Sequence, residues 1–184
     1  MDIITEFNES TISDIKRRIE NFQVGIMPTD TVYGLLGIAT NESVKKRIYE
    51  IKQRDFAKQL VIQVGTNYDL CNIVENISLP AKRLIKRFFP GAITLVFKAS
   101  QNFILKYNWE IDTVAIRIPD HKILLNVLNL LNQPIFVTSS NISGENISSN
   151  VDFLKKQFNE KIDFFVDDGC EYRDIPSTIV DVSN

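Results

Sequence analysis

The order of apolar and polar positions along the chain predicts strands and helices in close alternation. Short apolar runs that end at Gly, Pro or polar residues predict buried strands over residues 24–27, 60–64, 93–97, 113–118, 135–137, 164–167 and 179–182. Apolar residues at helical spacing, with polar residues available as caps, predict helices over residues 10–21, 42–54, 69–74, 80–89, 120–131 and 150–159. This alternation predicts an α/β fold with a largely parallel or mixed, twisted sheet and flanking helices.

Two segments do not follow this pattern. Residues 99–112 have no clear period, so we expect a loop or a hairpin there. Gly34 and Gly37 follow the strand at 24–27, and we expect them to break the chain before the helix at 42–54.

The length and composition indicate one globular unit. The 184 residues suffice for one sizeable core, and we expect a single domain over residues 1–184. With 44% hydrophobic and 24% charged residues, the balance is that of a soluble protein. The longest apolar run, residues 33–39, is far shorter than the ~20 residues that span a bilayer. Residues 1–6 lack the apolar core of a signal peptide, so we expect a cytoplasmic protein that does not enter membranes.

The net charge and the small numbers of cysteine and histidine limit the kinds of site that the chain can form. The net charge of -2 argues against broad binding of nucleic acid, so an anion would have to meet a local cluster of cations. Cys71 and Cys170 are the only cysteines, which argues against a disulfide framework and against a zinc site. The single histidine, His121, excludes motifs that need two, and we expect it to be a surface or capping residue.

Polar residues at the ends of predicted strands form two candidate binding loops. Pro28 has no N–H to donate to a sheet, so its strand should end there. The hydroxyl and carboxylate groups that follow belong to Thr29, Asp30, Thr31 and Tyr33. Residues 138–144 follow another strand, and their side chains and backbone N–H groups could hold a phosphate or a carboxylate. An ordinary polar turn has the same composition.

Basic residues supply candidate partners for an anion. Lys52, Arg54 and Lys58 lie at the end of a predicted helix and on the connection after it. Arg117 lies within an apolar strand, so it either pairs with an internal carboxylate or faces a ligand. Neither a P-loop nor a dinucleotide fingerprint is present. A nucleotide would therefore have to be held by these cations and by the hydroxyl loops.

Several stretches, in order along the chain, resemble the motifs of the YrdC-like threonylcarbamoyl-AMP synthases. They are residues 28–35 (PTDTVYGL), 52–54 (KQR), 89–95 (FPGAITL), 113–121 (TVAIRIPDH), 138–144 (TSSNISG) and 176–181 (PSTIVD). The resemblance implies the short, single-domain type, with an open, mixed sheet around a concave basic cavity. It also implies a nucleotidyltransferase that makes L-threonylcarbamoyladenylate and pyrophosphate from L-threonine, bicarbonate and ATP, for the threonylcarbamoyl modification of tRNA.

The resemblance further implies the roles of individual residues. Lys52 and Arg54 would be catalytic. The ATP-binding residues would be Lys52, Arg54, Lys58, Thr113, Ser139 and Asn141. The L-threonine-binding residues would be Thr31, Gln63, Arg117, Val137 and Ser177. Mg²⁺ would enter with ATP, held by phosphates and water instead of a protein carboxylate cluster. The implied further partners are tRNA and the downstream threonylcarbamoyl transferase.

Two other functions are compatible with these residues. A non-catalytic RNA-binding module would use the cations of residues 45–58 and 82–87, but no stacking aromatics are interleaved with them. The cations of residues 82–87 are also what an ordinary solvated helix face would carry. A related carbamoyl-adenylate enzyme would keep the chemistry and use a different acceptor. RNA binding would weaken steeply with salt and ignore ATP, whereas competition between amino acids would reveal the acceptor.

Overall fold

The computed structural model describes residues 1–184 and contains one nine-stranded sheet. Its strands are β1 (Asp2–Ile4), β2 (Gly25–Pro28), β3 (Tyr33–Ile38), β4 (Val61–Gln63), β5 (Ile93–Lys98), β6 (Thr113–Arg117), β7 (Ile135–Ser139), β8 (Phe164–Val166) and β9 (Thr178–Asp181). Its helices are α1 (Glu9–Glu20), α2 (Glu42–Lys52), α3 (Leu79–Phe88), α4 (Gln101–Tyr107), α5 (Lys122–Leu131) and α6 (Val151–Phe158), with one 3-10 turn, η1 (Leu70–Asn72).

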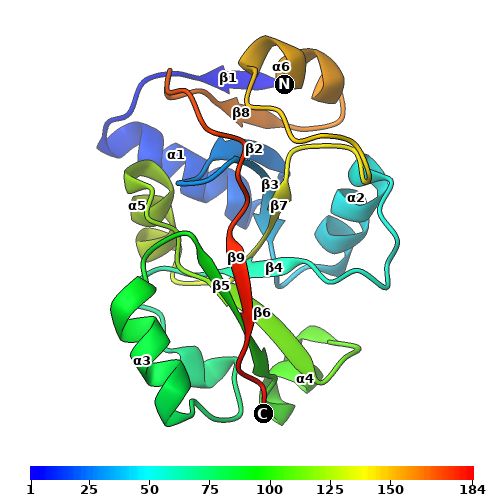
Figure 1. Ribbon diagram of the computed structural model, residues 1–184. Coiled ribbons are helices and arrows are strands. Elements are labelled where there is room, and N and C mark those ends of the chain that lie inside the picture. The colour runs from blue at the N-terminus through cyan, green and yellow to red at the C-terminus, as the bar shows by residue number, and fades with distance from the viewer.

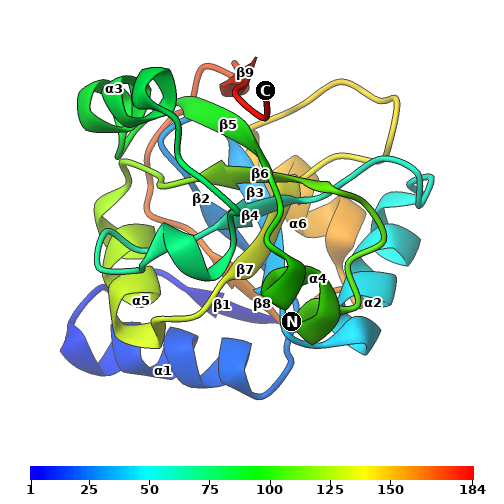
Figure 2. The same ribbon diagram turned by 90° about the horizontal axis from the view of Figure 1, so that it is seen from below.

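The sheet is mixed and its strands do not follow chain order. The order across the sheet is β1-β8-β2-β3-β7-β4-β6-β5-β9. The pairs β1/β8, β2/β8, β4/β6 and β5/β9 are parallel, and the remaining neighbours are antiparallel. Figure 1 shows β9 crossing in front of β5 and β6, with α1 and α5 on one side of the molecule and α2 on the other. The view in Figure 2 confirms that α1 and α5 lie side by side.

Polar caps explain where the helices begin. Each α-helix follows a residue whose side chain accepts a hydrogen bond from a backbone N–H of the first turn, which satisfies one of the donors that a helix end leaves free. These residues are Asn8, Asn41, Ser78, Ser100, His121 and Asn150. The predicted helix at 120–131 therefore begins after His121 and not at Asp120.

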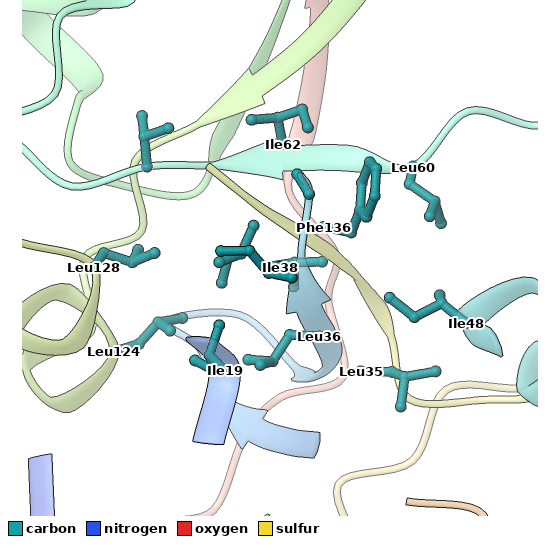
Figure 3. Packing of buried hydrophobic residues seen from close by; sticks show 14 of the residues in the cluster. Ile19, Leu35, Leu36, Ile38, Ile48, Leu60, Ile62, Leu124, Leu128 and Phe136 are labelled. Carbon is teal, nitrogen blue, oxygen red and sulfur yellow. The ribbon is translucent and has the colours of Figure 1, made fainter. Parts of the chain in front are cut away.

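The core lies on both faces of the central strands. In Figure 3, Leu36 and Ile38 of β3 lie toward Ile19 of α1 and toward Leu124 and Leu128 of α5. Leu35, which points to the opposite face of the same strand, lies on the side of Ile48 in α2. A strand covered on both faces carries a continuous apolar run instead of an alternating one.

The alternation of strands and helices correctly predicts the α/β class, but the pattern misses three elements. β3 was expected to be a break because it contains Gly34 and Gly37. A Cβ on Gly34 would lie 2.7 Å from Cγ1 of Val137, and one on Gly37 would lie 2.5 Å from Cγ1 of Val44. These glycines therefore allow neighbouring side chains to approach a buried strand and do not end it.

The other corrections concern short elements. β1 is mostly exposed and lies at the edge of the sheet, so its residues show no buried pattern. α4 occupies part of 99–112, where a loop or hairpin was expected, because seven residues are too few to show a helical period. The helix expected at 69–74 is only the 3-10 turn η1. None of the helices is long and apolar enough to span a membrane.

Candidate active site

A polar cavity of about 200 Å³ lies where several strands end. Its walls come from the turn between β2 and β3, the loop after α2, the central strands β4, β6 and β7, and the residues that enter β9. Figure 1 shows the C-terminal segment that leads into β9 running across this part of the sheet. Most of the residues that line the cavity are polar, which suits a small hydrophilic ligand.

Arg117 lies at the end of β6 and anchors one wall of the cavity. Its side chain is only 5% exposed, and its Nη2 donates to Oδ1 of Asp30. Nη1 donates to Oγ1 of Thr31 at 2.9 Å, and Nε donates to the carbonyl oxygen of Gly91 at 3.1 Å. The sequence left open whether Arg117 pairs with an internal carboxylate or faces a ligand. It pairs with Asp30 and also lines the cavity.

The turn between β2 and β3 presents hydroxyl groups to the same wall. Oγ1 of Thr29 donates to the carbonyl oxygen of Val32 at 2.7 Å and lies 2.9 Å from Oγ1 of Thr31. Oγ1 of Thr29 also accepts from the backbone N–H groups of Thr31 at 3.1 Å and of Val32 at 3.2 Å. The hydroxyl oxygen of Thr31 accepts the bond from Arg117. The turn is thus ordered by its own hydroxyls before any ligand binds.

Residues of β4, β7 and β9 form the facing walls. Gln63 is 2% exposed, lines the cavity, and has a buried Oε1 without a hydrogen-bond partner. Val137 also lines the cavity. Ser177 lies just before β9, and its Oγ is 2.8 Å from Oγ1 of Thr94 in β5. Thr94 and Ser177 therefore fix the entry of the C-terminal segment against the sheet.

Arg54 is the second guanidinium that lines the cavity. Its Nε donates to the carbonyl oxygen of Lys58 at 3.1 Å, and its Nη2 donates to that of Gln59 at 2.8 Å. Arg54 forms no ion pair with a carboxylate, so its charge is available to an anion. Gln59 also lines the cavity, and its Nε2 lies 3.2 Å from Oγ1 of Thr113. Lys58 itself is exposed and lies outside the cavity wall.

Lys52 and Asn141 lie behind the wall to which Ser139 belongs. Nζ of Lys52 donates to the carbonyl oxygens of Ser139 and Asn141 and to Oδ1 of Asn141. Burial, with the neighbouring charge of Arg54, lowers the pKa of Lys52 from 10.5 to about 8. The cation is therefore held under the loop after β7 and does not project into the cavity.

The structure thus separates the predicted site residues into two groups. Thr31, Arg54, Gln63, Arg117, Val137, Ser139 and Ser177 line one cavity. Lys52, Lys58, Thr113 and Asn141 do not line it. Four polar residues of the wall, Thr29, Gln59, Thr94 and Thr138, were not among the predicted ligands. The signal that could have indicated Thr94 is a hydroxyl inside the apolar run 93–97.

His121 fastens the segment that leads to Ser177. We call residues 167–177, between β8 and β9, the strap. Nε2 of His121 lies 3.0 Å from Oδ2 of Asp168 and 3.1 Å from the hydroxyl of Tyr172, which itself donates to Asp168 at 2.7 Å. These hydrogen bonds lower the pKa of Asp168 although its burial opposes the shift. His121 is a capping residue, as expected, and it also anchors the strap.

The fold and the cavity define a class: an α/β protein with a polar, arginine-bearing cavity where the strands of one mixed sheet end. The exposed cations of α3 are not part of this cavity. The chain belongs to the Sua5/YciO/YrdC family, since the family model described as "Telomere recombination" matches residues 17–184.

Named relatives and solved structures agree with this membership. The chain is 33% identical to the threonylcarbamoyl-AMP synthase of Pyrococcus abyssi, over 94% of this chain and 54% of that protein. It is 31% identical to the one of Pseudoalteromonas translucida, over 96% of both. The structure of P. abyssi Sua5 complexed with L-threonine superposes with a TM-score of 0.88 at 33% identity, over 98% of this chain and 54% of that one. The chain thus spans about half of the longer relatives and nearly all of the shorter one.

Escherichia coli YciO has the same fold. It superposes with a TM-score of 0.82 over 100% of this chain and 89% of its own, at 20% sequence identity.

Proposed function

We propose that this chain is an L-threonylcarbamoyladenylate synthase, which converts L-threonine, bicarbonate and ATP into threonylcarbamoyl-AMP and pyrophosphate. The observation that carries the proposal is a single cavity lined by Arg54, Arg117 and several hydroxyls, in a chain that aligns over 96% of its length with a named threonylcarbamoyl-AMP synthase. We expect the product to serve the threonylcarbamoyl modification of tRNA. The partners would then be tRNA and a transferase that consumes the adenylate.

The reaction needs positioning and charge stabilisation more than a covalent nucleophile. The threonine amine and bicarbonate form a carbamate with loss of water. A carbamate oxygen then attacks the α-phosphorus of ATP, and the bond from that phosphorus to the pyrophosphate oxygen breaks. Two mutually repelling anions must be held side by side, and negative charge grows on the phosphate oxygens. A cavity with two fixed guanidiniums suits that task.

The cavity suggests how the two substrates divide its walls. The guanidinium of Arg117 carries N–H groups beyond those used on Asp30, Thr31 and Gly91, and these can bind the carboxylate of threonine. Gln63, Val137 and Ser177 would surround the remainder of the amino acid. The phosphates of ATP would lie toward Arg54 and Ser139 on the other side. This arrangement would bring the carbamate to the α-phosphate.

We also propose that Mg²⁺ enters with ATP. No group of three or more His, Cys, Asp or Glu side chains in the chain could form a dedicated metal site. The hydroxyls and guanidiniums of the cavity suit the oxygens of a phosphate, so an incoming ion would keep phosphate and water ligands. The ion would neutralise phosphate charge when bound, while Arg54 would orient the phosphates.

The experiment incubates the purified chain with ATP, Mg²⁺, bicarbonate and threonine and measures pyrophosphate and threonylcarbamoyl-AMP. We expect both products to form only when threonine and bicarbonate are present. Absence of threonine-dependent product from a folded sample would reject the proposal. Excess serine tests which amino acid is the acceptor. If the enzyme used another amino acid, serine in excess would compete with threonine and reduce the formation of threonylcarbamoyl-AMP.

A further inference from the structure

Lys52 is an internal cation without an acidic partner. It is the last residue of α2 and is 1% exposed, and Arg117 is the only other charged residue in the buried set. Arg117 pairs with Asp30, whereas no carboxylate lies within ion-pair distance of Lys52. Burying an ammonium is costly, so the surrounding polar groups must compensate for its lost hydration.

Oxygen atoms of one loop provide that compensation. Nζ of Lys52 donates to the carbonyl oxygen of Ser139, to that of Asn141 at 2.7 Å, and to Oδ1 of Asn141 at 3.1 Å. A lysine ammonium has three N–H donors, and all of them are used here. A phosphate could bind Nζ only if one of these internal bonds broke. The loop also donates a hydrogen bond to Lys52, because the N–H of Ser143 donates to the carbonyl oxygen of Lys52 at 2.8 Å.

The same loop forms part of the cavity wall. Oγ of Ser139 donates to Oδ1 of Asn141 at 2.6 Å, the oxygen that also accepts from Lys52. Nδ2 of Asn141 donates to the carbonyl oxygen of Glu145 at 2.7 Å, which closes the loop. Ser139 lines the cavity, but Lys52 and Asn141 do not. The ammonium therefore acts on the cavity through the loop and not by direct contact.

We infer that Lys52 is a positioning residue for the proposed reaction, fixing the loop of residues 139–145 so that Ser139 faces the nucleotide, and is not itself a ligand of the ATP phosphates. The inference rests on the proposed function for the identity of the ligand. The hydrogen bonds that carry it exist without any ligand. Arg54, two residues away, is the matched contrast because it lines the cavity and makes no bond to this loop.

The test compares Lys52→Met with Arg54→Met. Hydrogen exchange of residues 139–145 is measured first, without nucleotide. Lys52→Met removes the ammonium and leaves loop oxygens unsatisfied, so we expect amide exchange to accelerate by at least ~10-fold. Arg54→Met should leave exchange in this loop unchanged. If Lys52→Met exchanges like the wild type, the inference is wrong, whatever happens to its activity.

Kinetics then separate positioning from a general loss of structure. We expect Lys52→Met to raise the KM for ATP by ~10-fold or more and to leave the KM for threonine nearly unchanged. Lys52→Arg retains a cation and should recover part of the loss. If Lys52→Met raised the KM values for ATP and threonine equally, or if Lys52→Arg recovered no activity, Lys52 would have only a structural role and the inference would be wrong. If the wild type makes no threonylcarbamoyl-AMP, the proposed function fails, and the exchange comparison still tests the loop.

A measurement on the wild type covers the case in which Lys52→Met does not fold. The ¹⁵N signal of the Lys52 ammonium is followed by NMR against pH, with and without ATP and Mg²⁺. Arg54 is the charged group that acts on this ammonium besides its burial. Below the titration midpoint near pH 8, we expect this nitrogen to show no coupling to phosphorus when ATP is bound. A coupling through a hydrogen bond between this nitrogen and an ATP phosphorus would show direct phosphate contact and would overturn the inference.

Discussion

Nη1 of Arg117 donates to Oγ1 of Thr31 at 2.9 Å, although 86 positions separate the two residues in the sequence. The bond joins β6 to the turn between β2 and β3, and Asp30 on the same turn neutralises the guanidinium. The side chain of Arg117 thus connects two parts of the sheet and also forms part of the cavity wall. Under the proposed function, stability and substrate recognition would depend on the same contacts.

Replacing Arg117 should therefore destabilise the fold. Arg117→Met leaves the carboxylate of Asp30, only 13% exposed, without its partner. We expect the free energy of unfolding to fall by about 3–5 kcal/mol, measured by urea denaturation. Adding Asp30→Asn should recover part of the loss, because the unpaired charge is gone. Lys46→Met is the control, since its pair with Glu50 is solvent-exposed and 3.9 Å long, and it should have no measurable effect.

The buried ammonium of Lys52 should give stability a distinct pH dependence. Its pKa is about 8 in the folded chain, against 10.5 for an unperturbed lysine. Between these values the unfolded chain binds more protons, so this group makes stability rise with pH and costs most below pH 8. We expect the free-energy difference between wild type and Lys52→Met to shift in favour of the wild type from pH 8 to 10. A difference that is flat with pH would contradict this.

Gly34 should resist substitution because of Val137. A Cβ at this position would lie 2.7 Å from Cγ1 of Val137, which is buried in the neighbouring strand. We expect Gly34→Ala to lower the free energy of unfolding by about 1–3 kcal/mol, measured by thermal or urea unfolding. Combined with Val137→Ala, which removes the clashing methyl group, the total cost should be smaller than the sum of the two. Strictly additive costs would show that the clash is not the cause.

The strap should loosen when Asp168 loses its charge. Asp168→Asn weakens the bonds to His121 and Tyr172 while keeping the side chain's size. We expect faster hydrogen exchange over the strap, residues 167–177. Because Ser177 is the last residue of the strap and a proposed threonine ligand, we also expect a higher KM for threonine. The strap of the wild type should also loosen as pH falls. The pKa of Asp168 is lowered in the folded chain, so its hydrogen bonds stabilise the fold only while the carboxylate is ionised. Asp152→Asn in α6 is the control, and its effect on strap exchange should be nil.

Much of the fold could be predicted because buried elements repeat apolar residues at a fixed period. Helices α1, α2, α3, α5 and α6 were predicted to within a few residues. β3 was not, because two glycines that normally break elements here admit the side chains of Val137 and Val44. The pairing of β7 between β3 and β4 joins segments far apart in the sequence, and no local pattern carries that information.

The site was harder to predict for a geometric reason. Lys52 and Arg54 lie two positions apart and were expected to act together. Gln53 between them caps α2 in the left-handed conformation, with φ of 50°. Because of this turn, Lys52 lies under the loop after β7 and Arg54 lines the cavity. A non-glycine residue in that conformation has no strong sequence signal, so only the structure shows that the two cations point in different directions.

The cavity takes its walls from residues 29 to 179, drawn from nearly every central strand. A proteolytic cut between residues 29 and 179 leaves no fragment that retains all of them, and a partly melted molecule would have lost at least one. The proposed catalytic activity should accordingly vanish in a single step on heating, together with the sheet.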